Sequence, residues 1–149
     1  MTDLWLAIAH HVLVFGLAMM LAAEGLLVRE GMNSADAARV ARLDSGYGGT
    51  ASLVILIGIL RVIYGAKGSL YYVENVWFWA KIASFLCVGL FSIPPTLRFF
   101  AWRSALKTSS GFVPEAADIG RVRFYIRMEL HFLIAVIALA AVMARYSSI

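Results

Sequence analysis

The chain has 149 residues, of which 62% are apolar and only 15% are charged. Soluble domains are roughly half apolar and about a quarter charged, so this composition excludes an ordinary soluble globular protein. The single cysteine, Cys87, excludes a disulfide framework and a cysteine zinc cluster. The formal net charge is +4, but the basic residues flank apolar segments, which favours orientation in a membrane over nucleic-acid binding.

Apolar runs predict an all-α membrane protein, a single-domain bundle of four transmembrane helices over residues 1–149. The first run covers residues 4–28 and is interrupted only by His10, His11 and Glu24. It is too long for the core of a signal peptide, and no basic residue precedes it. We therefore expect a first span that is retained in the membrane.

The rest of the chain is expected to contribute one amphipathic helix and three further spans. Residues 31–45 predict a short cytoplasmic amphipathic helix capped by Ser34. The later spans are predicted at residues 47–64, 76–97 and 124–144.

Prolines and glycines mark where these later spans are expected to end. Pro94-Pro95 follows Ile93 and is expected to break or kink the third span. Gly111 and Pro114 mark the loop before the fourth span.

Lysine and arginine are unevenly distributed between the two ends of the predicted bundle. Eight basic residues lie in the loops after the first and third spans, against three on the opposite side. The positive-inside rule therefore predicts that both termini lie outside the cytoplasm, as in a multi-pass protein of the bacterial inner membrane. The eight are Arg29, Arg39, Arg42, Arg98, Arg103, Lys107, Arg121 and Arg123.

Several titratable groups lie inside the predicted spans, where they normally face a partner, a cavity or a cofactor. At about 1.5 Å of rise per residue, His10 and His11 lie roughly 8–10 Å below the outer end of the first span, at the depth of Lys81. Arg61 is near the same end, and His131 enters about 10 Å deep from the opposite side. We expect two polar clusters, one in each leaflet. Two acids on the cytoplasmic side, Glu24 and Glu129, are expected to form ion pairs with Arg29 or Arg127.

Three intramembrane histidines predict a heme b site, because neutral imidazole is a common protein ligand of heme iron in helical bundles. The alternative is that each histidine only hydrogen-bonds to a neighbouring helix. The similar depths of His10, His11 and Lys81 in the membrane favour an outer heme between a first-span histidine and a ligand near Lys81. The different depth of His131 allows a second heme there. One or two hemes per chain fit the sequence. The candidate iron ligands are His10, His11 and His131, with Met19 and Met20 as weaker candidates opposite His131.

Basic side chains near the span ends are expected to pair with heme propionates. Lys81 is equally consistent with such an anion and with snorkelling to the outer surface. The cofactor-binding candidates besides the histidines are Lys81, Arg61, Tyr64, Lys67, Arg98 and Arg127.

Four short strings are characteristic of the chain: HHVLVFG at residues 10–16, LRVIYGAKG at 60–68, FWAK at 78–81 and SIPPTLRF at 92–99. With them the chain resembles, over nearly its whole length, a family of bacterial inner-membrane proteins defined as a domain of unknown function.

A more distant resemblance rests on Trp5 with His10 and on Trp77 with Lys81. These pairs are similar to the first-span Trp and His and the third-span Trp-x-x-x-Lys of HemJ-type protoporphyrinogen oxidases, small membrane proteins that bind heme b. The resemblance implies that His10 is a heme ligand and that Lys81 is a functional residue of the same pocket. The chain differs from that family at Trp79, where the family often has histidine.

The leading hypothesis is therefore a HemJ-like membrane protein that binds heme b, a b-type cytochrome with a role in electron transfer or redox chemistry. The alternatives are an enzyme of heme biosynthesis similar to protoporphyrinogen oxidase, and a cofactor-free transporter or scaffold. The expected partners are the lipid bilayer, an electron donor or acceptor, and further copies of the chain rather than nucleic acid. Self-association is expected through Ala135, Ala138 and Ala141.

Overall fold

The computed structural model describes residues 1–109 and 111–146, and these residues form helices with no strand among them. Four helices are long and apolar enough to cross a membrane, which confirms the predicted all-α fold with four spans. They are α1 (Thr2–Leu27), α2 (Ser34–Tyr64), α4 (Val76–Thr108) and α5 (Ala116–Arg145), and the short α3 (Gly68–Val73) connects α2 to α4.

The segment predicted as a separate amphipathic helix is the first part of α2. That helix runs without interruption from Ser34 to Tyr64, and its N-cap is Asn33 rather than Ser34. The Asn33 side-chain oxygen accepts the backbone N–H of Asp36 at 2.9 Å. Continuity is favourable because a break at membrane depth would leave backbone groups without hydrogen-bond partners.

Helix α4 continues through Pro94 and Pro95 to Thr108, so these prolines do not break the third span, which was one of the two expected effects. Helices in membranes tolerate proline where neighbouring helices and polar side chains compensate for the lost hydrogen bonds. The following loop is also shorter than predicted, because α5 already begins at Ala116. Apolar runs therefore predicted the central part of each long helix and missed the further turns at the loop end of α2, α4 and α5.

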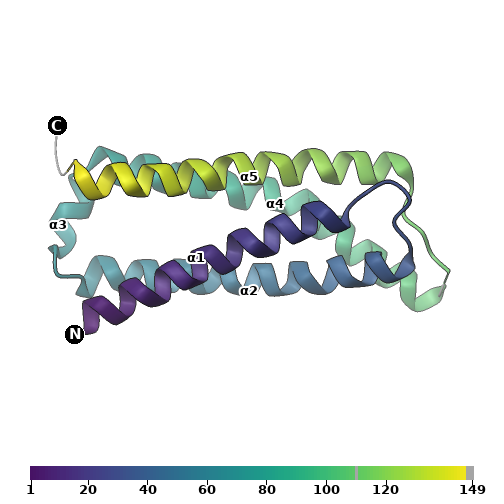
Figure 1. The fold of residues 1–149 in the computed structure, drawn as a ribbon, viewed down its shortest axis with the longest axis horizontal. Coiled ribbons are helices and arrows are strands. Elements are labelled where there is room, and N and C mark those ends of the chain that lie inside the picture. Colours follow the sequence, from purple (N-terminus) through teal and green to yellow (C-terminus); the bar gives the residue numbers. More distant parts are fainter. Residues whose placement is uncertain (110, 147–149) are drawn as a thin grey trace.

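The four long helices form a ring in which α1 neighbours α2, α2 neighbours α4, α4 neighbours α5, and α5 neighbours α1. The closest pairs are α1–α2 and α4–α5, so the bundle consists of two hairpins (Figure 1). The start of α1, the end of α5 and the short α3 lie at one end, which we call the terminal end. The connections at residues 28–33 and 109–115 lie at the other, the loop end.

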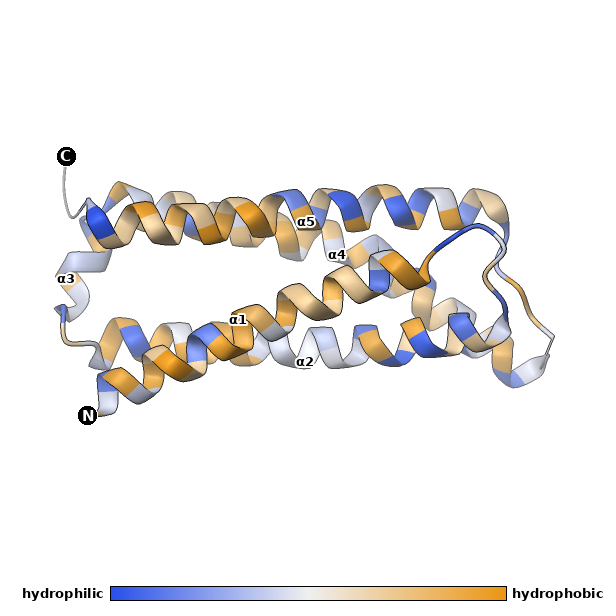
Figure 2. Ribbon diagram, viewed as in Figure 1, coloured by the Kyte–Doolittle hydropathy of each residue, from blue (hydrophilic) through white to orange (hydrophobic). Residues whose placement is uncertain are grey.

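The hairpins converge toward the loop end and separate toward the terminal end (Figure 1). Much of the buried core accordingly lies near the loop end. Its members there include Val28, Met32, Val40, Phe99, Trp102, Ile119, Val122 and Ile126. Hydrophilic residues of α2 and α5 also gather toward this end (Figure 2).

Candidate functional site

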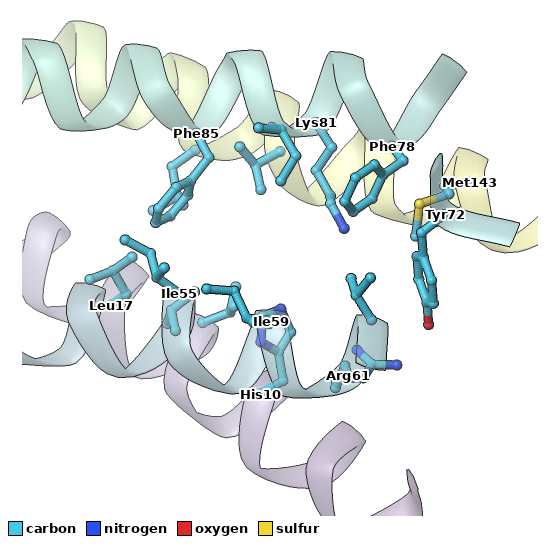
Figure 3. Close-up of a pocket in the computed structure, with 17 residues that line it drawn as sticks. His10, Leu17, Ile55, Ile59, Arg61, Tyr72, Phe78, Lys81, Phe85 and Met143 are labelled. Carbon is cyan, nitrogen blue, oxygen red and sulfur yellow. The ribbon is translucent and has the colours of Figure 1, made fainter. Parts of the chain in front are cut away.

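A cleft lies between the two hairpins in the terminal half of the bundle and encloses about 200 Å³. All four long helices and α3 contribute to its walls, and Figure 3 shows side chains from the two hairpins facing each other across it. Most of the lining is aliphatic or aromatic. Three of the lining residues carry basic side chains: His10, Arg61 and Lys81.

His10 reaches the cleft from α1 and packs against α2 at Gly58. A Cβ atom at position 58 would lie 3.4 Å from Cε1 of the His10 ring, so this glycine provides the space that the imidazole occupies. The Nδ1 atom of His10 is buried and has no hydrogen-bond partner among the described residues. A buried polar atom without a partner is costly, so this imidazole is suited to bind a ligand.

Lys81 extends from α4 into the cleft toward the α1–α2 hairpin (Figure 3). Its ammonium nitrogen lies 5.2 Å from the centre of the Phe78 ring, within the range of a cation–π contact. This contact does not neutralise the charge, and the ion pairs found among the described residues do not include Lys81.

Arg61 lines the same cleft from the last turn of α2. Its Nε atom is buried and makes no hydrogen bond in the described part of the chain, and no ion pair there involves it. Two cations without a counter-ion at membrane depth are unfavourable unless an anion joins them. The cleft therefore favours a ligand with an apolar body and negatively charged groups.

The floor of the cleft is the fully buried middle of the bundle. Leu17 and Leu133 line the cleft and are 0% and 2% exposed, and Phe85 packs against the same core. At the rim Ile55 and Ile59 are about half exposed, so the cleft opens toward the lipid.

The structure separates the three histidines rather than gathering them. His11 is exposed on the outside of α1, and its Nδ1 lies 2.6 Å from the Ala7 carbonyl oxygen. His131 is exposed on α5, and its Nδ1 lies 2.6 Å from the Arg127 carbonyl oxygen. Of the three, only His10 lines the cleft.

The predicted partners of His131 do not face it across the bundle. Met19 is 68% exposed. The sulfur of Met20 instead accepts a hydrogen bond from Thr50 of α2 at 3.7 Å. No hydrogen bond joins either methionine to His131 among the described residues.

Four further cofactor-binding candidates do not line the cleft. Tyr64 is exposed, and Lys67 donates a hydrogen bond of 2.9 Å to the hydroxyl of Tyr71. Arg98 pairs with Asp118 at 3.5 Å and lines a separate groove. The Nε of Arg127 donates to the Arg123 carbonyl oxygen. None of the four lines the cleft that contains His10.

Sequence reasoning missed several residues that shape the cleft. Tyr72 of α3 and Met143 of α5 lie together at its terminal edge (Figure 3). Gly58 is the neighbour of His10. The sequence did not predict α3 as a separate helix, and nothing in it indicated that Tyr72 faces the interior, where this residue is 7% exposed.

Residues 2–146 match the model of a family described as "Predicted membrane protein (DUF2214)". The chain belongs to this family. The match confirms the resemblance to a membrane family of unknown function and covers all five helices. Comparisons with curated proteins and with solved structures found no match.

The chemistry available in the cleft is that of one imidazole and two cations in an apolar setting. Within the described residues, no three or more His, Cys, Asp or Glu side chains are arranged to hold a metal ion together. A metal in this cleft would therefore need a ligand set that the protein supplies only in part, such as a macrocycle with one axial imidazole.

Proposed function

We propose that this protein is a heme-b-binding membrane protein, HemJ-like in its cleft, with a role in electron transfer or redox chemistry. The observation that carries the proposal is the convergence of His10, Arg61 and Lys81 on one apolar cleft. Among the described residues, the His10 Nδ1 there has no hydrogen-bond partner and neither cation has an acidic partner.

Heme b matches this cleft in each chemical respect. Its ring is apolar, its two propionates are anionic, and its iron accepts an imidazole nitrogen. The enclosed space of about 200 Å³ is less than the roughly 300–1,000 Å³ typical of ligand pockets, so the macrocycle would occupy the lipid-open side as well. The half-exposed rim at Ile55 and Ile59 permits this.

Each residue then has a definite task. His10 would hold the iron, and Arg61 and Lys81 would hold the propionates by charge-assisted hydrogen bonds. The apolar walls would exclude water from the ring. Bound heme supplies one-electron transfer, and its potential responds to burial and to nearby charge.

We further propose that the protein is a multi-pass component of a bacterial inner membrane with its termini on the periplasmic side. The support is the excess of basic residues in the two loops at the loop end. The cleft would then lie near the periplasmic face. Self-association through α5 is part of the proposal, because Ala138 and Ala141 are exposed on that helix.

The visible spectrum of the purified protein tests the proposal. Protein made in cells supplied with iron and a heme precursor, then isolated in detergent, should show a Soret band that shifts on reduction with dithionite. Extraction should yield heme b at about one equivalent per chain, the stoichiometry expected of a single His10 site. A folded preparation from the same cells that absorbs no visible light would contradict the proposal and favour a transporter or scaffold.

A second candidate uses the same cleft for catalysis. Protoporphyrinogen has an apolar ring and two carboxylates, so Arg61 and Lys81 would bind it by the contacts proposed for heme. Growth of a strain lacking its protoporphyrinogen oxidase separates the two functions. Rescue by this gene favours the oxidase, and heme binding without rescue favours electron transfer.

A further inference from the structure

A second polar cluster lies inside the bundle in its loop-end half. Glu24 of α1, Asp44 of α2 and Glu129 of α5 are 2%, 5% and 1% exposed. Helix α2 also contributes Tyr47, which is 4% exposed, and α4 contributes Thr96. Every long helix thus directs a polar side chain into one layer of an otherwise apolar interior.

Two of the three carboxyl groups have hydroxyl partners. The hydroxyl of Tyr47 donates to Oε2 of Glu129 at 3.1 Å, which links α2 to α5 through the middle of the bundle. The hydroxyl of Thr96 donates to Oδ1 of Asp44 at 2.7 Å. Each of these acids therefore keeps one oxygen without a partner among the hydrogen bonds of the described residues.

Glu24 is the member without a partner. Its Oε1 atom is buried and accepts no hydrogen bond within the described chain, and the side chain lies within electrostatic range of both Asp44 and Glu129. A buried acceptor within electrostatic range of two other acids lacks a positively charged or hydrogen-bearing ligand.

No basic side chain supplies that positive charge. The expected ion pairs of Glu24 and Glu129 with Arg29 or Arg127 are not formed, because Arg29 pairs with Asp36 at 3.5 Å and Arg127 donates to a backbone carbonyl. The ion pairs found in residues 1–109 and 111–146 involve no acid other than Asp36 and Asp118. If all three acids were ionised, their negative charges would be buried without a counter-ion. A buried acid avoids this free-energy cost by binding a proton.

The cluster is separate from the cleft. Leu17, Leu21 and Leu133 are at most 2% exposed and belong to the core packed between the cleft and this cluster. Glu24 is only three residues from the end of α1, which is about 5 Å along the helix axis. The loop end is therefore the nearer end of the bundle for Glu24.

We propose that Glu24, Asp44 and Glu129 form a proton-binding site that exchanges with the compartment at the loop end. The titratable groups facing the site are these three acids and Tyr47, with Thr96 as the contribution of α4. Protons fit better than a metal ion, because the acids do not form a metal-holding group within the described residues. Proton binding by these acids does not depend on a cofactor in the cleft.

Infrared spectroscopy of the purified protein tests the site directly. The wild type at neutral pH should show a carbonyl band of protonated carboxylic acid that shifts in D2O. The band should weaken in Glu24→Gln, Asp44→Asn and Glu129→Gln, which replace each acid by the isosteric amide. The matched control is Glu30→Gln, because Glu30 is exposed in the loop after α1. Absence of the band from folded wild type would overturn the proposal.

Thermal stability supplies a second measurement, which remains informative if one of the single variants does not fold. The folded bundle holds protons that the unfolded chain releases at neutral pH, so the melting temperature should rise as the pH falls from mildly alkaline to mildly acidic. This slope should flatten when all three acids are replaced and persist in Glu30→Gln. Stoichiometric Mn²⁺ or Ca²⁺ binding that is lost in Glu24→Gln would instead establish a metal site and overturn the assignment to protons. Neither readout requires heme, so each is independent of the visible spectrum.

Discussion

Replacing His10 by alanine should remove heme from the purified protein, whereas the same change at His11 or His131 should leave it bound. Of the three histidines, only His10 lines the cleft shared with Arg61 and Lys81. Partners in the outer shell of a metal ligand already contribute about 10- to 100-fold to affinity, so loss of the axial ligand itself should cost more than about 100-fold. Heme content per chain and the reduced spectrum measure this directly.

The two other histidines are matched controls because they share one geometry. Each is exposed on the outside of its helix, and each has Nδ1 2.6 Å from the carbonyl four residues earlier. Loss of heme from His131→Ala with retention in His10→Ala would contradict the single-site proposal and restore a site near the middle of α5. An imidazole supplement that restores the spectrum of His10→Ala would show that the missing group is the iron ligand rather than a packing contact.

The number and type of helices were predictable because the bilayer imposes a strong and local requirement. A span needs about 20 apolar residues, and the chain contains four such runs. The helix ends were harder to predict, since residues 98–108 and 116–123 mix charged with apolar residues and yet remain helical. Their helicity depends on packing at the loop end, where Trp102, Ile119 and Val122 are buried, and no apolar run signals such contacts.

The candidate site was predictable only as a set of alternatives. His10 and His11 point about 100° apart, so at most one faces a given neighbour, and only the packing of α1 on α2 at Gly58 decides which. Because α5 begins at Ala116 rather than near residue 124, His131 lies 15 positions into the helix.

The buried acids illustrate a different limit. The sequence correctly located Glu24 and Glu129 toward the loop end, but nearby arginines suggested ordinary ion pairs. The bundle turns both acids inward, and the nearest arginines remain at the surface. The buried face of a helix is determined by where the other helices pack against it. Charged residues close in the sequence do not indicate that face.

Arg61 and Lys81 should strengthen heme binding only through their contacts with the two heme propionates. Arg61→Met and Lys81→Met keep an apolar side chain of similar length and remove the charge. A hydrogen bond to a charged group contributes about 1.5–3 kcal/mol, so each change should weaken binding of ferric heme to the heme-free protein by about 10- to 100-fold. Titration of heme in detergent, followed by its absorbance, measures the affinity.

The dimethyl ester of heme isolates the carboxylate contribution, because it lacks both negative charges and retains the ring and the iron. Wild type should bind the ester more weakly than heme, and this difference should shrink in Arg61→Met and in Lys81→Met. Lys67→Met and Arg98→Met are the matched controls, since Lys67 contacts Tyr71 and Arg98 pairs with Asp118 away from the cleft. If the controls lose heme affinity as much as the cleft variants do, binding follows the general positive charge of the protein rather than two cations at His10. An unchanged preference for heme over its ester in both cleft variants would mean that the propionates lie elsewhere, and the orientation proposed for the ring would have to be reversed.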